Sequence, residues 1–242
     1  MESFNVLLTC SSNKTQLIEW AKRSVSKLDY KINVYAGDTN LNVQSKYLSD
    51  KFWHMPKCVK KNYPKILRFC KKQNIKIIIP SSDKELLFWS NFKQDLKKNK
   101  IYVMVSNYET VNSCHDKLRF FKKLKKFNFV SFTSNNLNDF KSNQTLIGKD
   151  RYGSGSKKII IGKKEKFIKE YLSKKKIENY IFQKYINSKN EISLDCYFSK
   201  KNKLLKVLAR NRSLIINGES AITTVIDGNK FINKINLVGS KL

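Results

Sequence analysis

The sequence predicts an α/β fold in two parts, with a parallel α/β sheet in the N-terminal half and an α+β, antiparallel arrangement in the C-terminal half. In residues 1–108, short apolar runs alternate with segments of helical spacing, a pattern typical of strands joined by helices. From about Glu109 onward, strand-like runs follow one another with short turns between them, which favours antiparallel pairing. We therefore expect two domains, 1–108 and 109–242, that meet near residues 106–109.

The first half contains four runs suited to strands of a parallel sheet. Residues 4–9 and 75–79 are rich in apolar side chains, as strands buried on both faces are. Residues 14–27 place Leu17, Ile18, Ala21 and Val25 at helical spacing. In order, we expect strand 4–9, helix 14–27, strand 32–35, a short helix before residues 51–53, helix 63–72, strand 75–79, helix 83–96 and strand 101–105.

Ligands of such sheets bind beyond the carboxyl ends of the strands, which here are residues 10–12, 37–38 and 81–85. The first of these turns, Thr9-Cys10-Ser11-Ser12, has none of the glycines of a dinucleotide-binding fingerprint. We therefore do not expect this half to bind NAD.

The second half begins with helices and continues with antiparallel strands. A polar stretch rich in Asn and Ser, 131–143, separates the helices from a hairpin over 146–162. We expect helices 109–114, 116–127 and 164–175, and strands 180–186, 191–198, 204–212 and 221–226.

The hairpin carries a loop whose residues suit an anion. Glycines let a backbone approach a ligand closely, and serine hydroxyls, backbone N–H groups and cations bind phosphate oxygens. The pattern is neither a Walker loop nor a dinucleotide fingerprint. Taken alone, the loop fits a phosphate cradle and an ordinary basic turn equally well. The loop and its flanking cations are Lys149, Arg151, Gly153, Ser154, Gly155, Ser156, Lys157 and Lys158.

Two later strands place acids and arginines on defined faces. Alternation puts Glu191 and Asp195 on one face of their strand. In the next strand, Arg210 and Arg212 share a face. These faces suit either a solvated sheet surface or part of a nucleotide site.

The composition narrows the class of protein. The chain has 49 Lys and Arg against 19 Asp and Glu, a net charge of +30, which suits a polyanion partner. No nucleic-acid-binding motif accompanies this charge, so we expect nucleic acid to bind only non-specifically.

The five cysteines are scattered and form no CxxC pair, which indicates the reducing cytoplasm as the location of the protein. We find neither a signal peptide nor an apolar run long enough to span a membrane.

Four motifs, taken together in their order, resemble the ATP-grasp superfamily, in particular the branch of the carbamoyl phosphate synthetase large subunit. The resemblance implies a Rossmann-like pre-ATP-grasp domain, followed by an ATP-grasp domain with a glycine-rich lid subdomain over about 128–182. The motifs are VLLTCSS to PSSDKEL near the N-terminus, Asp116-Lys117 at a helix start, GKDRYGSGSKK, and YIFQKYINSKNEISLD followed by LKVLARNRSLIINGES.

The same resemblance implies roles for individual residues toward ATP. Lys117 and Lys149 match the family's two nucleotide-contacting cations, and Glu191 matches the acid that binds the ribose hydroxyls. Arg210 and Arg212 match the strand before the acceptor-side loop and are the catalytic candidates. The remaining matches are the lid residues Gly153, Ser154, Gly155 and Ser156, and the adenine strand with Gln183, Lys184, Tyr185 and Ile186.

The sequence departs from the family at three places. Asp150 stands where a proline usually follows the lysine, and Lys184 stands where an acid commonly follows the glutamine. The family's magnesium ligands lie in a segment like E-x-N-P-R, which does not occur before Leu242. We therefore expect an ATP-grasp domain that is truncated before its metal-ligand strands. Such a domain lacks the Mg²⁺ ligands that the family uses.

Three functions remain open at this point. The first is a ligase that uses ATP to activate a small carboxylate as an acyl phosphate for attack by an amine, or the N-terminal portion of such a ligase. The second is a non-catalytic nucleotide-binding remnant, or half of a split enzyme whose other polypeptide supplies the metal ligands. The third, less favoured, is a protein that binds polyanions or nucleic acid.

Overall fold

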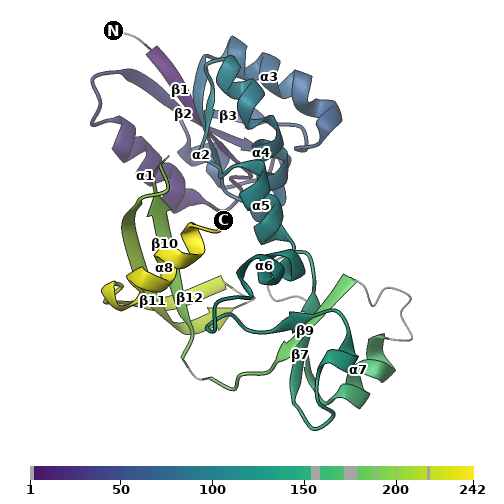
Figure 1. Cartoon of the computed structure of the whole chain (residues 1–242). Helices are drawn as coiled ribbons and strands as arrows, with labels where there is room; N and C mark the ends of the chain where they lie inside the picture. Colours follow the sequence, from purple (N-terminus) through teal and green to yellow (C-terminus); the bar gives the residue numbers. More distant parts are fainter. Residues whose placement is uncertain (1–2, 154–158, 172–178, 189, 200, 217–218) are drawn as a thin grey trace. The chain divides into compact units, whose positions relative to one another are not determined.

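The computed structural model describes residues 3–153, 159–171, 179–188, 190–199, 201–216 and 219–242. The chain divides into two compact units, Met1–Val111 and Asn112–Leu242. Figure 1 shows the helices and strands of each unit.

The first unit is built on a five-stranded parallel sheet with the strand order β3-β2-β1-β4-β5. The predicted parallel sheet is therefore confirmed, and β3 joins it at the edge beside β2. Its elements are β1 (Ser3–Thr9), α1 (Thr15–Val25), β2 (Lys31–Asp38), α2 (Ser45–Leu48), β3 (Lys51–His54), η1 (Lys60–Asn62), α3 (Tyr63–Lys72), β4 (Ile75–Pro80), α4 (Asp83–Lys98) and β5 (Tyr102–Val103), with α5 (Tyr108–His115) across the unit boundary.

Helices cover both faces of this sheet because its strands are apolar on both faces. Leu7 of β1 packs in a cluster with Ile66 of α3 and Trp89 of α4. Its neighbour Leu8 points to the opposite face and packs in a cluster with Ile18 of α1. This arrangement is the doubly wound α/β architecture that the alternating pattern predicts.

The second unit contains two antiparallel sheets, as the run of strands with short turns predicts. One has the strand order β6-β9-β7-β8 and the other β10-β11-β12. The elements are α6 (Lys117–Leu124), β6 (Thr133–Ser134), η2 (Leu137–Asp139), β7 (Leu146–Asp150), β8 (Ile160–Gly162), α7 (Lys164–Tyr171), β9 (Tyr180–Lys184), β10 (Ile192–Phe198), β11 (Leu204–Ile216), β12 (Glu219–Ile226), η4 (Asn229–Phe231) and α8 (Ile232–Gly239).

The hairpin of β7 and β8 packs against α7 through a close contact at a glycine. Leu146 of β7 pairs with Gly162 of β8, which confirms the strand–loop–strand prediction. A Cβ atom at Gly148 would lie 2.6 Å from Cε1 of Phe167, which is fully buried in α7. Phe182 of β9 completes this aromatic core. Glycine at 148 therefore lets the helix approach the sheet.

Some elements of the second unit differ from the prediction. Helix α8 was not expected, β6 and η2 form inside the stretch predicted only as polar, and β11 continues to Ile216. Strand β9 ends at Lys184, two residues earlier than predicted. Of the predicted helix 164–175, the described part is α7, which ends at Tyr171.

Two further observations concern the whole chain. All five cysteine thiols are free. Among the helices that lie in the described ranges, none has both the length and the apolar character required to cross a membrane.

Candidate functional site

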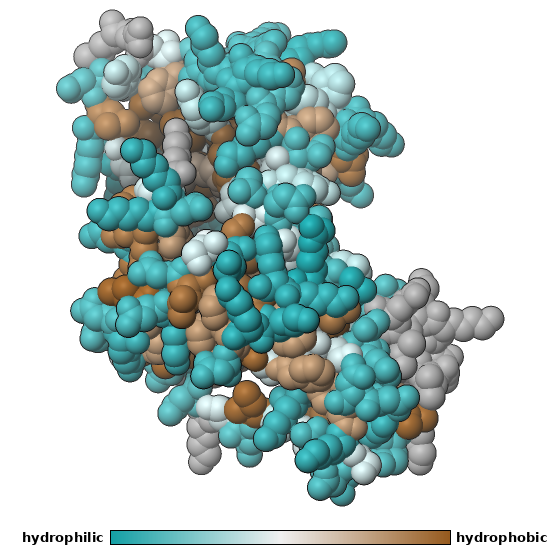
Figure 2. Space-filling model, viewed as in Figure 1, coloured by the Kyte–Doolittle hydropathy of each residue, from teal (hydrophilic) through white to brown (hydrophobic). Residues whose placement is uncertain are grey.

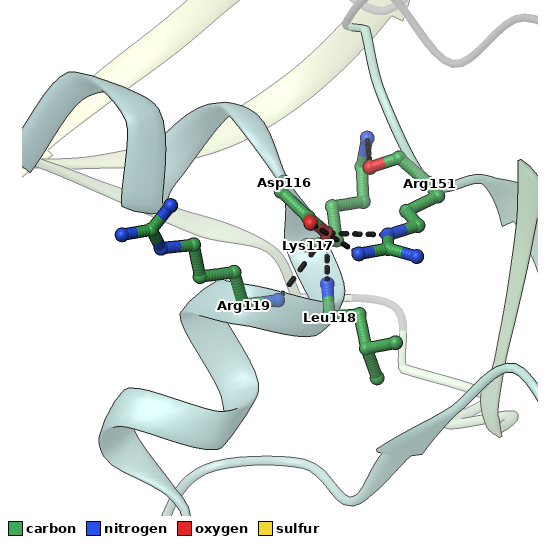
Figure 3. Close-up of polar contacts among 5 residues, drawn as sticks. All are labelled: Asp116, Lys117, Leu118, Arg119 and Arg151. Atoms are coloured by element: carbon green, nitrogen blue, oxygen red, sulfur yellow. Dashed lines mark hydrogen bonds and ion pairs between the residues drawn. The ribbon is translucent and has the colours of Figure 1, made fainter. Parts of the chain in front are cut away.

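The candidate site begins at the N-terminus of α6. Asp116 is the N-cap of this helix, and its Oδ1 atom accepts hydrogen bonds from the backbone N–H groups of Leu118 (3.0 Å) and Arg119 (3.2 Å). A capping carboxylate satisfies N–H groups that have no partner within the helix, and it is stabilised by the helix dipole. This cap fixes where the helix starts and thus where Lys117 lies (Figure 3).

Arg151, which follows β7, forms a two-pronged ion pair with Asp116 (Figure 3). Nε donates to Oδ1 at 2.8 Å and Nη2 donates to Oδ2 at 2.5 Å. Burial by itself raises the pKa of Asp116, but the hydrogen bonds from Arg151 and from the backbone hold that pKa below its ordinary value. Asp116 is therefore ionised, and it joins α6 to the hairpin.

Lys117 extends this connection through both its backbone and its side chain. Its N–H group donates to the carbonyl of Arg151 at 3.1 Å, and its Nζ atom donates to the carbonyl of Gly153 at 2.7 Å. Gly153 has a φ of +98°, a conformation that favours glycine. Burial lowers the pKa of Lys117, while the carboxylates of Asp150 and Asp116 act in the opposite direction.

Lys149 of β7 is near enough to Lys117 for the two charges to interact. It pairs with Ile181 of β9, and alternation places its side chain on the sheet face opposite the aromatic core that holds Phe182. The pKa of Lys149 is lowered, first by burial and then by the positive charge of Lys117. Two half-buried amines that repel each other form a site where an anion would be stabilised.

The four residues predicted for the adenine strand lie in β9 and just beyond it. Gln183 shares the sheet face of Lys149, and its Nε2 atom donates to Oγ1 of Thr133 in β6 at 2.7 Å. Lys184 is exposed, and Ile186 is 69% exposed. The N–H group of Tyr185 is occupied by the carbonyl of Thr145 at 2.9 Å.

The remaining candidates form ion pairs on the β10-β11-β12 sheet. Ser193 pairs with Arg210 in the register, so the acids and arginines predicted for these strands share one face. Arg210 donates from Nε to Asp195 at 2.8 Å. Arg212 pairs with Glu191 and also donates from Nε to Oγ of Ser220 at 2.6 Å. The acid predicted to bind ribose is therefore engaged by an arginine in this state.

Three predicted lid residues, Ser154, Gly155 and Ser156, lie outside the described residues. Over the ranges that the structure does describe, no group of three or more His, Cys, Asp or Glu side chains is arranged to hold a metal ion. No chemical step below is routed through a metal.

Two residues of this site were not among the predicted ligands. Asp116 and Arg151 were noted as a helix start and as a flanking cation, but their pairing joins positions 35 residues apart. The sequence shows that both residues are charged. It does not show that they pair, because their contact depends on how the hairpin packs against α6.

Comparisons with known proteins identify both halves of the chain. Residues 114–238 match the family model of the ATP-grasp domain, and residues 6–104 match that of the PylC-like N-terminal domain. No curated protein sequence matches the chain.

Several solved structures share the fold at low sequence identity. N5-carboxyaminoimidazole synthetase from Staphylococcus aureus has a TM-score of 0.70 at 17% identity, with 100% of this chain and 64% of that chain covered. The biotin carboxylase domain of 2-oxoglutarate carboxylase from Hydrogenobacter thermophilus, in complex with MgADP, ADP and bicarbonate, has a TM-score of 0.73 at 12% identity, with 100% and 58% covered. L-amino acid ligase from Bacillus licheniformis has a TM-score of 0.70 at 14% identity, with 98% and 60% covered. The chain thus spans 58–64% of the length of these structures.

Proposed function

The chain belongs to the ATP-grasp family, and on this premise we propose that it binds ATP, with Lys117 and Lys149 on the phosphates. The family prediction made from the four motifs is confirmed, while the branch of the carbamoyl phosphate synthetase large subunit stays a prediction. The observation that carries the proposal is a pair of half-buried lysines on joined elements: Lys149 lies in β7 of the hairpin, and Lys117 of α6 donates to the carbonyls of Arg151 and Gly153, which follow β7. The positive charge of Lys117 also lowers the pKa of Lys149. Phosphate oxygens would neutralise both charges.

The rest of the nucleotide would extend along β9 toward β10. We assign adenine to the backbone and side chains of Gln183, Lys184, Tyr185 and Ile186, and the ribose hydroxyls to Glu191. Gln183 supports this direction because it shares the sheet face of Lys149. For Glu191 to accept hydrogen bonds from ribose, its carboxylate has to share or give up its contact with Arg212.

The reaction we propose is the activation of a small carboxylate. The γ-phosphoryl group passes to a carboxylate oxygen, the bond to ADP breaks, and an acyl phosphate forms. An amine nitrogen then attacks the acyl carbon and phosphate leaves. Arg210 and Arg212 would bind the negative charge of the transferred group, since phosphoryl transfer depends on positioning and charge neutralisation. The bicarbonate and MgADP bound to the Hydrogenobacter neighbour support a nucleotide and a small carboxylate as ligands.

Calorimetric titration with ATP tests the binding step. Lys149→Ala is expected to weaken ATP binding by about 10–100-fold, the effect of losing one charge-assisted hydrogen bond. Lys166→Ala is the matched control, because this exposed lysine of α7 contacts the carbonyl of Ile161 away from the candidate site. Equal ATP affinity in Lys149→Ala and the wild type would overturn the assignment of the site.

A second candidate is half of a split enzyme, which works with a separate polypeptide. The observation that favours it is the number of large apolar side chains that both faces of the β10-β11-β12 sheet expose, some of which reach the surface seen in Figure 2. Apolar patches of this kind mark interaction sites. Large exposed side chains on these strands are Ile192 (39%), Leu194 (36%), Tyr197 (60%), Leu205 (49%), Leu208 (44%), Leu214 (44%), Ile215 (39%), Ile216 (54%), Ile222 (56%) and Val225 (65%).

ADP formation separates these candidates. The protein is assayed with ATP, Mg²⁺ and a panel of carboxylates and amines, first alone and then with the polypeptide encoded next to it. Turnover by the protein alone supports the ligase, and turnover only in the mixture supports the split enzyme. Magnesium-independent ATP binding without turnover in either assay supports a non-catalytic nucleotide-binding module.

A further inference from the structure

The ion pair between Asp116 and Arg151 joins two elements that are distant in the sequence (Figure 3). Its two parallel hydrogen bonds fix both the distance and the orientation of the guanidinium and carboxylate groups. The side chain of Asp116 is 9% exposed and that of Arg151 is 24% exposed, so water screens this pair less than a surface ion pair.

Backbone contacts reinforce the same connection. Asp116 and Tyr152 form an antiparallel β-bridge, and the carbonyl of Arg151 accepts from Lys117. On its other side, the N–H group of Arg151 donates to the carbonyl of Asn179, which directly precedes β9, at 2.7 Å. Arg151 therefore links the start of α6 to the strands of the β6-β9-β7-β8 sheet.

The two lysines of the proposed phosphate site are close neighbours in the sequence of the two residues of this ion pair. Lys117 is the residue after Asp116, and Lys149 is two residues before Arg151. The like charges of the two lysines repel each other. Both amines can face one site only if a contact holds α6 and β7 together. The Asp116–Arg151 pair joins these two elements next to the lysines.

We propose that Asp116 and Arg151 are a positioning pair, which holds Lys117 of α6 and Lys149 of β7 at the spacing needed for both amines to bind one polyphosphate. The proposal rests on the proposed function for the identity of the anion, the phosphates of ATP. Neither Asp116 nor Arg151 has to touch the ligand.

Asp116→Asn separates positioning from helix capping, because asparagine caps a helix about as well as aspartate but does not attract Arg151 as an ion. Arg151→Lys keeps the positive charge but loses the planar fork that makes the two-pronged contact. Asp50→Asn is the control, since it removes an ion pair with Lys22 in the other unit.

The first measurement is the titration midpoint of the Lys149 amine in the unliganded protein. It is obtained by labelling the amine at a series of pH values and measuring the extent of labelling by mass spectrometry. If the pair holds Lys117 near Lys149, its loss lets Lys117 move away, and the titration midpoint of Lys149 rises in both variants. The direct effect of removing the negative charge of Asp116 has the opposite sign. An unchanged or lowered midpoint in Asp116→Asn would overturn the proposal, and Asp50→Asn is expected to leave the midpoint unchanged.

The second measurement is the affinity for ATP. Each variant is expected to bind ATP about tenfold more weakly, and the double variant no more weakly than either single one, because both changes break the same contact. If the wild type does not bind ATP, the proposed function fails, and the Lys149 titration still tests the positioning. If the wild type binds ATP and both variants match it in affinity and in the Lys149 titration, positioning fails while the proposed function stands.

Discussion

In the proposed site, we expect Lys149 to have opposite consequences for stability and for ligand binding. Its amine is half-buried, and both burial and the nearby charge of Lys117 disfavour its protonated form. Such a group costs folding free energy until an anion binds, which is the usual trade-off at a functional site.

Lys149→Met is therefore expected to stabilise the folded protein while weakening ATP binding. Methionine keeps most of the length of the side chain and removes the buried charge. The expected gain is about 1 kcal/mol, which corresponds to a rise in Tm of about 2–4 °C in a chain of this size. Scanning calorimetry and ATP titration of the same preparation check both effects. A lowered Tm together with weaker binding would indicate that Lys149 only supports the structure.

The pH dependence of stability follows from the same shifts. The pKa values of Lys117 and Lys149 in the folded protein lie below the ordinary value of 10.5. Between the lowered pKa and 10.5, the unfolded chain holds more protons than the folded one, so the contribution of these lysines makes stability rise with pH in this window. In Lys149→Met, this rise is expected to be smaller in urea unfolding curves measured as the pH approaches 10.5.

Single residues show how far the sequence could predict the site. Lys117 and Lys149 could be chosen because they stand in motifs with a defined order. The pairing of Asp116 with Arg151 could not be predicted, since either charge had many possible partners among 68 charged residues made up of 49 Lys and Arg and 19 Asp and Glu. Likewise, the contact between Gln183 and Thr133 depends on β6, an element of two residues.

At the scale of elements, the contact of β7 with α7 depends on Gly148, because glycine has no side chain that would occupy the space between them. Gly148→Ala places a Cβ atom 2.6 Å from the ring of Phe167, which is fully buried and has no room to move. We expect a destabilisation of about 1–3 kcal/mol, as for other overpacked cores. Gly162→Ala is the matched control in β8, because the atoms that it meets belong to the flexible side chain of Lys166. Equal loss of stability in both variants, by urea unfolding, would contradict the packing role of Gly148.

In the first unit, α4 carries a buried acid that links this helix to β1 and to the loop that holds Cys58. Oε2 of Glu85 accepts from Thr9 of β1 at 2.5 Å and from Trp89 at 3.3 Å, and Oε1 accepts from the thiol of Cys58 at 3.4 Å. Burial raises the pKa of Glu85 above its ordinary value, although these hydrogen bonds act in the opposite direction.

This acid is expected to make the stability of the first unit depend on pH. Between the ordinary pKa of 4.5 and the raised value, the folded state holds more protons than the unfolded state, so stability falls as pH rises through this window. Glu85→Gln is expected to flatten this part of the profile. Tryptophan fluorescence in urea is a suitable readout, since Trp20, Trp53 and Trp89 all lie in the first unit. Asp29→Asn, at an exposed carboxylate, is the control, and a fall that persists in Glu85→Gln would contradict the assignment.

The elements also show why prediction succeeded in some places and failed in others. Strands β1 and β4 are long apolar runs between helices of clear spacing, so local sequence predicted them. Strand β6 exists because Thr133 and Ser134 pair with β9, and nothing in its own polar sequence indicates a strand. Helix α8 is short, and at its last residue, Gly239, an added Cβ atom would lie 2.6 Å from the ring of Phe198 in β10. Its formation therefore depends on tertiary packing that its own sequence does not indicate.

At the scale of the whole molecule, the net charge of +30 is a property separate from the candidate site. The positive charge comes from 49 Lys and Arg spread along the chain, whereas the site depends on two lysines with a defined environment. Charge of this kind attracts any polyanion at low salt, because binding releases counterions.

We therefore expect the protein to bind single- and double-stranded nucleic acid without sequence preference, and to lose this binding as salt is raised. With about 6–10 phosphate contacts, the affinity falls by about 10³–10⁵ between 50 and 200 mM salt. Fluorescence anisotropy with unrelated oligonucleotides checks this, and Lys149→Ala is expected to bind them as the wild type does, because it removes one of many cations. Affinity for one RNA structure that persists at 200 mM salt would contradict this account. That outcome would favour a protein whose main ligand is a polyanion, since ordinary electrostatic attraction does not select a structure and does not persist in salt.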